Sequence, residues 1–163
     1  MTASEGIGRC IEGRFDGKGQ ARIALLAARF NDFIVNALIG GAEDALRRHG
    51  VPAANVSLVR VPGAFEMPVA AAGLVQRADV DAVIALGAVI RGSTPHFDYV
   101  AGSCVRGLAQ VAERSGKPVI LGVLTTDTIE QAIERAGTKA GNKGFEAAVS
   151  ALEMVDLMRQ LAQ

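Results

Sequence analysis

Four runs of apolar residues divide this chain, and they constrain its fold more than any other feature of the sequence. The runs are dense in Val, Ile, Leu and Ala and cover residues 22–28, 56–61, 81–90 and 118–124. Continuous apolar runs of this length are typical of strands that are covered on both faces, as in parallel sheets. The pattern therefore predicts a parallel sheet in the interior of the molecule.

Segments with helical spacing separate and follow these runs, at residues 32–49, 65–76, 95–114, 127–136 and 143–161. Their boundary residues agree with this assignment. Gly50 and Pro52 end the first helix, and Asp127 with Glu130 has the spacing of a capping box that begins the fourth. Alternating strands and helices form right-handed crossovers. We expect an α/β fold, a flavodoxin-like three-layer sandwich with a four-stranded parallel sheet flanked by helices.

The N-terminal segment is rich in glycine and has little periodicity. We expect residues 1–10 to form a flexible tail and residues 11–163 to form a single domain. Residues 11–15 alternate enough for a short strand. This segment is too short and too glycine-flanked to be stable alone, so we expect it to pair with the sheet of a neighbouring subunit.

Composition excludes several classes of function. Half of the 163 residues are apolar, but charges interrupt every run before it reaches membrane-spanning length, so no membrane partner is expected. The apolar surplus suggests that surface is buried between subunits. The 17 basic residues balance the 17 acidic ones, and no basic stripe with aromatics is present, which argues against nucleic acid. The first residues contain neither a basic segment nor an apolar signal core, so we expect a cytoplasmic protein.

The common signatures of cofactor and metal sites are missing from the sequence. No glycine-rich dinucleotide motif follows a strand, and there is no Walker loop. Two cysteines and two histidines lack the spacing of a zinc site. Cys10 and Cys104 are expected to be free thiols, the second of them buried. We expect no cofactor and no metal.

Polar and aromatic residues follow the ends of the four expected strands, at 29–31, 62–66, 91–96 and 125–127. In open α/β sheets, ligands bind outside the carboxyl ends of the strands. An aromatic ring, an amide, a carboxylate, hydroxyls and a histidine are therefore expected to converge on one edge. This set suits a small polar molecule with a flat ring.

His96 is the strongest candidate for a catalytic group. Thr94 is expected to be the N-cap of a helix, with Pro95 at the first helical position. His96 then lies in the first turn, where the helix dipole disfavours the imidazolium form. A neutral histidine beside free backbone N–H groups is a proton acceptor next to an anion site.

A purely structural role remains open for several of these residues. Phe30 could lie in the core, His96 could be merely a polar residue in a first helical turn, and Glu66 could only complement a helix dipole. The other such alternatives are helix caps, helix-end charges and solvated side chains, for Ser93, Thr94, Arg135 and Lys143.

Four blocks of the sequence resemble the 6,7-dimethyl-8-ribityllumazine synthase family of riboflavin biosynthesis. They read ARFN, VPGAFE, GAVIRGSTPHF and ERAGTKAGNK, at residues 28–31, 61–66, 87–97 and 134–143. The resemblance runs from about residue 11 to near the C-terminus. It implies condensation of 5-amino-6-ribitylaminouracil with 3,4-dihydroxy-2-butanone 4-phosphate. An amine attacks the ketone, phosphate leaves, and ring closure with loss of water follows, without metal or cofactor.

The resemblance also implies a role for each candidate site residue. Phe30 would stack on the pyrimidine and His96 would move protons. Leu121 stands where the family often has phenylalanine, at a subunit boundary that completes the site. The ring and ribityl chain would be held by Asn31, Ala64, Phe65, Glu66, Ala88, Val89 and Ile90. The phosphate would be held by Ser93, Thr94 and Arg135, and Lys143 would contact the ribityl chain or the phosphate.

The family implies a homo-oligomer, a pentamer, and in some members an icosahedral capsid of pentamers. The turn at residues 137–144 resembles that of capsid-forming members. Three alternatives for the function are open: a related riboflavin synthase-type enzyme, a non-catalytic lumazine- or flavin-binding module, and a shell protein. The block around His96 and the presence of Arg135 argue against the first alternative.

Overall fold

The computed structural model describes residues 6–16 and 20–163 and contains the expected parallel sheet. Its four strands lie in the order β2-β1-β3-β4, and each neighbouring pair is parallel. Their bounds are β1 Ile23–Ala28, β2 Val56–Val61, β3 Ala82–Ile90 and β4 Val119–Thr126. The four predicted strands are thus confirmed to within two residues at each end.

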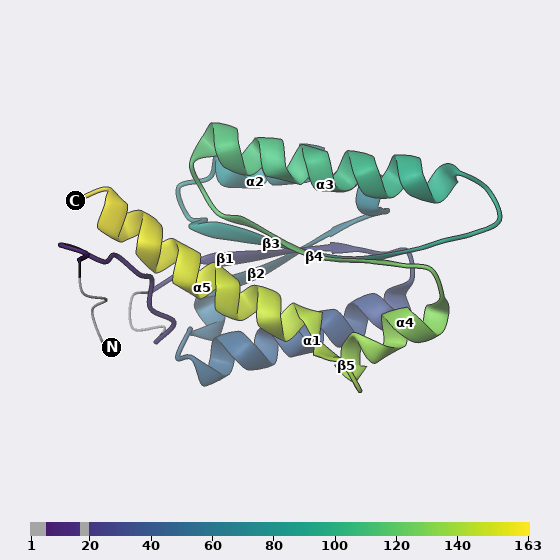
Figure 1. Ribbon diagram of the computed structural model, residues 1–163, viewed down its shortest axis with the longest axis horizontal. Coiled ribbons are helices and arrows are strands. Elements are labelled where there is room, and N and C mark those ends of the chain that lie inside the picture. Colours follow the sequence, from purple (N-terminus) through teal and green to yellow (C-terminus); the bar gives the residue numbers. More distant parts are fainter. Residues whose placement is uncertain (1–5, 17–19) are drawn as a thin grey trace.

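Helices cover both faces of this sheet and complete the predicted three-layer sandwich (Figure 1). One layer contains α2 (Met67–Val75) and α3 (His96–Ser115). The other contains α1 (Asp32–Arg48), α4 (Ile129–Glu134) and α5 (Lys143–Leu161). Two short 3₁₀ turns, Ala53–Asn55 and Ala64–Glu66, precede β2 and α2.

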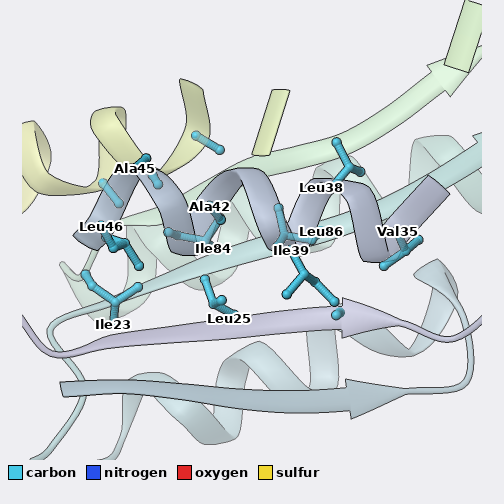
Figure 2. Packing of buried hydrophobic residues seen from close by; sticks show 14 of the residues in the cluster. Ile23, Leu25, Val35, Leu38, Ile39, Ala42, Ala45, Leu46, Ile84 and Leu86 are labelled. Carbon is cyan, nitrogen blue, oxygen red and sulfur yellow. The ribbon is translucent and has the colours of Figure 1, made fainter. Parts of the chain in front are cut away.

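Strand β1 shows why a central strand of this sheet is apolar without interruption. Ile23, Leu25 and Ala27 pack into the core under α1 and α5, whereas the alternate residues pack into a second core under α2 and α3. Figure 2 shows Leu25 facing Ile39 of α1, with Leu86 of β3 beside them. Burying a leucine or isoleucine side chain stabilises the fold by about 1.5–3 kcal/mol. Both faces of the sheet therefore require apolar side chains.

The start of α5 is fastened to α1. Asn142 caps α5, because its Oδ1 accepts hydrogen bonds from the backbone N–H of Gly144 at 2.8 Å and of Phe145 at 3.2 Å. Its Nδ2 donates to the carbonyl oxygen of Ala37 in α1 at 3.0 Å. A Cβ at Gly144 would overlap the backbone carbonyl of Leu38. The close approach of the two helices therefore requires glycine at this position.

Three helix starts differ from the sequence predictions. Helix α2 begins at Met67, two residues later than predicted, because residues 64–66 form a separate 3₁₀ turn. Thr94 does not cap α3: the N-cap is Pro95, no side chain caps this end, and the first turn is closed by a hydrogen bond from the Asp98 N–H to the Pro95 carbonyl at 3.1 Å. The ψ of 2° at Pro95 is that of a turn, so the regular helix begins one residue later, at His96.

The N-cap of α4 also lies one residue further on than predicted. Thr128 Oγ1 accepts from the Gln131 N–H at 3.1 Å, and Gln131 Oε1 accepts from the Asp127 N–H at 2.9 Å. The Asp127 carboxylate is held instead by Arg91, as described below. The expected helix over 127–136 is therefore shorter, and it is followed by an antiparallel hairpin, β5 Ala136–Thr138 with β6 Gly141–Asn142, that the sequence did not predict.

Residues 9–15 form no strand with any described part of this chain. They lie along the end of α5 instead: the Arg14 N–H donates to Asp156 Oδ2 at 2.9 Å, and Gln160 Nε2 donates to the carbonyl oxygen of Glu12 at 2.8 Å. Pairing of residues 11–15 with a neighbouring subunit involves a second chain and stays a prediction. Residues 1–5 of the predicted flexible tail lie outside the described residues.

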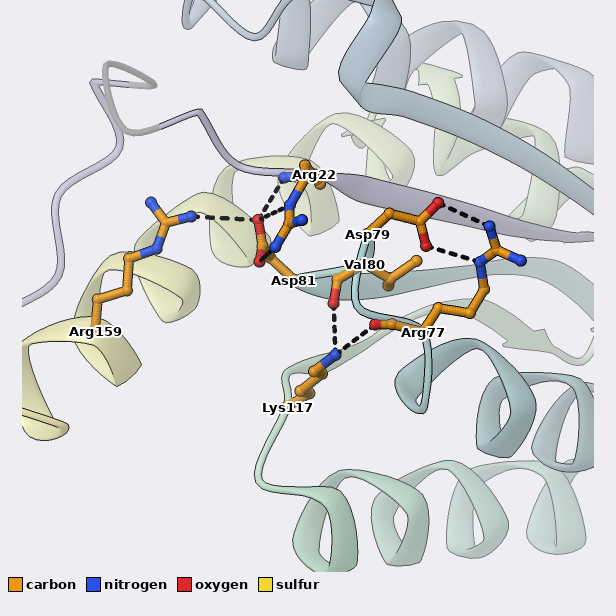
Figure 3. Close-up of polar contacts among 7 residues, drawn as sticks. All are labelled: Arg22, Arg77, Asp79, Val80, Asp81, Lys117 and Arg159. Carbon is orange, nitrogen blue, oxygen red and sulfur yellow. Dashed lines mark hydrogen bonds and ion pairs between the residues drawn. The ribbon is translucent and has the colours of Figure 1, made fainter.

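A polar network joins segments at the amino ends of the strands, opposite to the predicted ligand edge (Figure 3). Asp81 accepts from Arg22 Nη2 at 2.7 Å and from Arg159 Nη2 at 3.2 Å. Lys117 Nζ donates to the carbonyl oxygens of Arg77 at 2.8 Å and Val80 at 2.7 Å. The network ties the starts of β1 and β3 to the end of α5 and to the segment before β4.

Both cysteines are free, as predicted, and Cys104 is fully buried in α3. Burial disfavours the thiolate and raises the pKa of Cys104 to about 11. Among the described residues, no helix combines the length and the apolar character that crossing a membrane requires.

Candidate active site

A cavity of about 600 Å³ opens at the carboxyl ends of the strands. From β1 the chain passes to β2 on one side, and then returns to β3 on the other side of β1. Such a reversal of strand order leaves a crevice between the two central strands. The cavity is lined by Ala28, Phe30, Asn31, Gly63, Ala64, Phe65, Glu66, Ala88, Val89, Ile90, Gly92, Thr94, His96, Phe97, Tyr99 and Val100.

Most of the candidate residues meet at this cavity, and four do not line it. Ser93 lies between two lining residues in an exposed loop. Leu121 is half exposed in the middle of β4. Arg135 ends α4 and donates through Nη1 to the carbonyl oxygen of Gln131 at 2.9 Å. Lys143 begins α5, with its Nζ 2.6 Å from Glu146 Oε2.

Two aromatic rings flank the cavity without being part of the core. Phe30 is 73% exposed and Phe65 is 61% exposed. The alternative that Phe30 is a core residue is therefore wrong. Exposed aromatic rings beside an apolar cavity can stack on a flat ring, and this stacking adds to the free energy of burial.

Asn31 connects the ends of the two central strands. Its φ of 59° and ψ of 43° are left-handed, a region that asparagine tolerates better than most residues. Its Nδ2 donates to the carbonyl oxygen of Ala88 at 2.8 Å. Its Oδ1 makes no hydrogen bond within residues 6–16 and 20–163, so this oxygen is available to a ligand hydroxyl.

The carboxylate of Glu66 shapes one wall of the cavity. Its Oε2 accepts a hydrogen bond from the Gly63 N–H at 3.0 Å, which closes the turn Ala64–Glu66. Glu66 thus has a structural role at the start of this helical segment, as the sequence left open. The other carboxylate oxygen makes no bond within the described part of the chain.

His96 is the first residue of α3, is exposed, and lines the cavity. Its imidazole forms no hydrogen bond to any described residue, so both ring nitrogens are available. Tyr99 and Val100 line the same cavity and were missed from the sequence. Helical spacing could have predicted both residues, because residues three and four positions after His96 lie on the same helix face as His96.

Arg91, directly after β3, lies in the strand-end segment 91–96 that the sequence places at this edge, but no role was predicted for it. Its Nε donates to Asp127 Oδ1 at 2.8 Å, and its Nη1 donates to Asp98 Oδ1 at 3.3 Å. The guanidinium carbon lies 4.2 Å from the centre of the Phe97 ring. No periodicity or strand-end rule identifies such a contact, because it joins three segments that are separated in the sequence.

A doubly wound sheet with a cavity of this size at its switch point defines a class of α/β proteins that bind a small molecule at this edge. The chain belongs to the 6,7-dimethyl-8-ribityllumazine synthase family, whose model matches residues 20–159. It is similar to the protein named 6,7-dimethyl-8-ribityllumazine synthase from Halorhodospira halophila (strain DSM 244 / SL1), with 63% identity over 92% of this chain and 96% of that relative. A second relative of the same name, from Nitratidesulfovibrio vulgaris (strain DSM 19637 / Miyazaki F), is 59% identical over 94% of this chain and 97% of its own length.

Proposed function

We propose that this chain is a transferase that condenses 5-amino-6-(D-ribitylamino)uracil with 3,4-dihydroxy-2-butanone 4-phosphate, giving 6,7-dimethyl-8-ribityllumazine, phosphate and water in riboflavin biosynthesis. The observation that supports this most is the family match over residues 20–159, together with identities of 59–63% over nearly the whole chain. The cavity at the switch point provides a site for the reaction.

The pyrimidine and its ribityl chain bind in the apolar part of the cavity. Phe30 stacks on the ring, since its exposed face borders the cavity. Asn31 Oδ1 and the second oxygen of Glu66 accept hydrogen bonds from ribityl hydroxyls. The turn at Ala64 and Phe65 and the backbone of residues 88–90 contact the ring and its edge.

The phosphate binds at the start of α3. Ser93 and Thr94 provide hydroxyls, and free backbone N–H groups of the first turn point to the same place. Arg135 supplies the positive charge from a neighbouring subunit, because it does not line the cavity of its own chain. Leu121 and Lys143 complete the site in the same way. The active site is thus shared between two subunits.

His96 transfers protons in this reaction. The 5-amino group attacks the ketone and water leaves, phosphate is eliminated, and the ribitylamino nitrogen attacks the remaining carbonyl and closes the ring with loss of a second water. Each addition and elimination moves a proton, and the imidazole of His96 at the edge of the cavity is placed to carry it. Holding both substrates at attack geometry supplies much of the remaining rate.

Of the alternative functions, a riboflavin synthase-type enzyme is not favoured, since the family model and both relatives carry the lumazine synthase name. A module that only binds lumazine or flavin would bind ligand without turnover. A shell role is compatible with catalysis.

The assembly is a pentamer, and an icosahedral capsid of pentamers is its higher form. Residues 11–15 add a strand to the sheet of a neighbour, and the cytoplasm is the location of the enzyme. Light scattering measures the size of the assembly, with an isolated pentamer at neutral pH as the result against a capsid. Deletion of residues 1–15 weakens the assembly if the strand pairs between subunits, and unchanged sedimentation would contradict the pairing.

The test of the activity is to mix the purified protein with the two substrates and follow lumazine absorbance and fluorescence. His96→Ala should slow turnover by about 10²–10⁴-fold without abolishing it. His49→Ala is the matched control, because His49 Nδ1 lies 2.7 Å from the Ala45 carbonyl oxygen at the end of α1, away from the cavity. Absence of lumazine with the wild-type protein would overturn the proposed function.

A further inference from the structure

We propose that Arg91 is a positioning residue, which fixes the first turn of α3 and thereby sets the place of His96 at the cavity; this inference rests on the proposed function. Arg91 is the first residue after β3 and does not line the cavity itself. Its side chain reaches across the loop that leads to His96.

The backbone and the Nε atom of Arg91 are both hydrogen-bonded to the end of β4. Its backbone N–H donates to the carbonyl oxygen of Thr126 at 2.9 Å, which continues the pairing of β3 with β4. Its Nε donates to Asp127 Oδ1 at 2.8 Å, directly after β4. Main chain and side chain thus attach Arg91 to the last residue of β4 and to the residue that follows it.

The other end of the Arg91 guanidinium contacts the first turn of α3. Its Nη1 donates to Asp98 Oδ1 at 3.3 Å, and the group lies over the ring of Phe97 at 4.2 Å. Phe97 and Asp98 directly follow His96. A planar guanidinium that bonds two carboxylates and stacks on a ring has one favoured orientation, which a lysine ammonium lacks.

The start of α3 has little else to hold it. No side chain caps this helix at Pro95, and residues 91–96 are all exposed. His96 makes no hydrogen bond of its own among the described residues. Within the part of the chain that the structure describes, the contacts of Arg91 with Phe97 and Asp98 thus tie this turn to the sheet.

The effect of Arg91 should be on geometry more than on stability. The side chains of Arg91, Asp98 and Asp127 are 43%, 59% and 66% exposed, and exposed ion pairs contribute little to the free energy of unfolding. A displacement of a catalytic group by about 1 Å can, by contrast, cost on the order of 10²-fold in rate. Removing Arg91 should thus lower kcat in a protein that still folds and assembles.

The test compares Arg91→Met in two backgrounds. In the wild-type background, kcat for lumazine formation should fall by about 10–100-fold. The KM of the variant for the phosphorylated ketone should stay within about twofold of the wild-type value, because Arg91 does not touch the phosphate. In the His96→Ala background, Arg91→Met should lower the residual kcat by less than about twofold, because the group that it positions is already absent. Arg91→Lys should recover only part of kcat, since it keeps the charge without the planar shape.

Arg77→Met is the matched control. Arg77 also forms a double ion pair, with Asp79 at 2.9 and 2.7 Å, but at the amino end of the sheet, so kcat should be unchanged. If Arg91→Met fails to assemble, Asp98→Asn and Asp127→Asn remove its two partners in turn and carry the same comparison.

An equal loss of kcat in both backgrounds would overturn the positioning role while leaving the proposed function intact. A rise in KM for the phosphorylated ketone with unchanged kcat would overturn it too, and would make Arg91 a phosphate ligand. Absence of turnover in the wild-type protein would instead be a failure of the proposed function.

Discussion

The side-chain amide of Asn31 donates to the carbonyl oxygen of Ala88 at 2.8 Å, and this bond joins the carboxyl ends of the two central strands at the floor of the cavity. Asn31 also holds a left-handed backbone conformation, with φ at 59°. Position 31 thus requires both a left-handed backbone and a side chain that donates a hydrogen bond. Substitutions can test these two requirements separately.

Asn31→Gly should destabilise the fold less than Asn31→Ala. Both variants lose the bond to Ala88, but glycine adopts positive φ freely, whereas alanine there costs roughly 1–2 kcal/mol more. The free energy of unfolding in urea, measured for both variants at one protein concentration, checks this order. Alanine is the better residue elsewhere in helices, so an alanine variant as stable as the glycine one would show that the left-handed conformation is not retained.

Asp81 should make stability depend on pH at the acid end. Partial burial tends to raise the pKa of Asp81, but the hydrogen bonds from the Arg22 side chain and backbone, together with the charges of Arg22 and Arg159, outweigh burial, and the pKa lies below its ordinary value of 3.8. Because the folded state binds the proton less tightly than the unfolded state, the stabilisation is complete above about pH 4 and is lost as the pH falls through the folded pKa.

Asp81→Asn measures this contribution. The difference in unfolding free energy between wild type and variant should be constant from neutral pH down to about pH 5 and should shrink below pH 4. Asp79→Asn is the control, since its ion pair with Arg77 is exposed on both sides and should matter less. A difference that does not change with pH would contradict an ionised Asp81 as its source.

Two helical glycines should respond to alanine in opposite directions. Gly144→Ala should lower the free energy of unfolding, because the new Cβ would overlap the backbone of Leu38 and push α5 away from α1. At Gly40 in α1, the new Cβ would meet no described atom beyond its own stretch of helix within 4 Å, so Gly40→Ala should stabilise by about 0.5–1 kcal/mol through helix propensity. Urea unfolding of both variants at one protein concentration compares them. Equal changes in the two variants would mean that helix packing is not what requires glycine at Gly144.

The sequence predicts the layers of this fold because a strand that is buried on both faces consists of apolar residues along its whole length. Strand β1 is such an uninterrupted apolar run. The starts of α3 and α4 were each misplaced by a residue or more, because a cap depends on which side chain is free: the carboxylate of Asp127 is held by Arg91, and Thr128 caps α4 instead. The hairpin of β5 and β6 is too short for a periodic pattern.

For the site, the rule on strand ends predicts the right edge of the sheet, since parallel strands all end there. It includes Arg91 in the segment 91–96 but does not predict its contacts, which join residues that are distant in the sequence. The predicted roles of Leu121 and Lys143 depend on a second subunit and stay predictions.

Arg135 separates a structural role from a functional one most clearly. In this chain it ends α4 and donates to the carbonyl oxygen of Gln131 at 2.9 Å, as a helix-end cation does. That role alone would be worth a few tenths to about 1 kcal/mol of stability, and Arg135→Ala would leave kinetics unchanged.

As the phosphate ligand of a neighbouring subunit's site, Arg135 would contact a dianion through charge-assisted, bidentate hydrogen bonds that lysine cannot form. Arg135→Ala should then raise the KM for the phosphorylated ketone far more than the KM for the pyrimidine, and Arg135→Lys should recover only part of the loss. Steady-state kinetics with each substrate varied in turn, on variants whose assembly is intact by sedimentation, measure both constants. Unchanged kinetics toward the phosphorylated ketone would return Arg135 to its role at the end of α4.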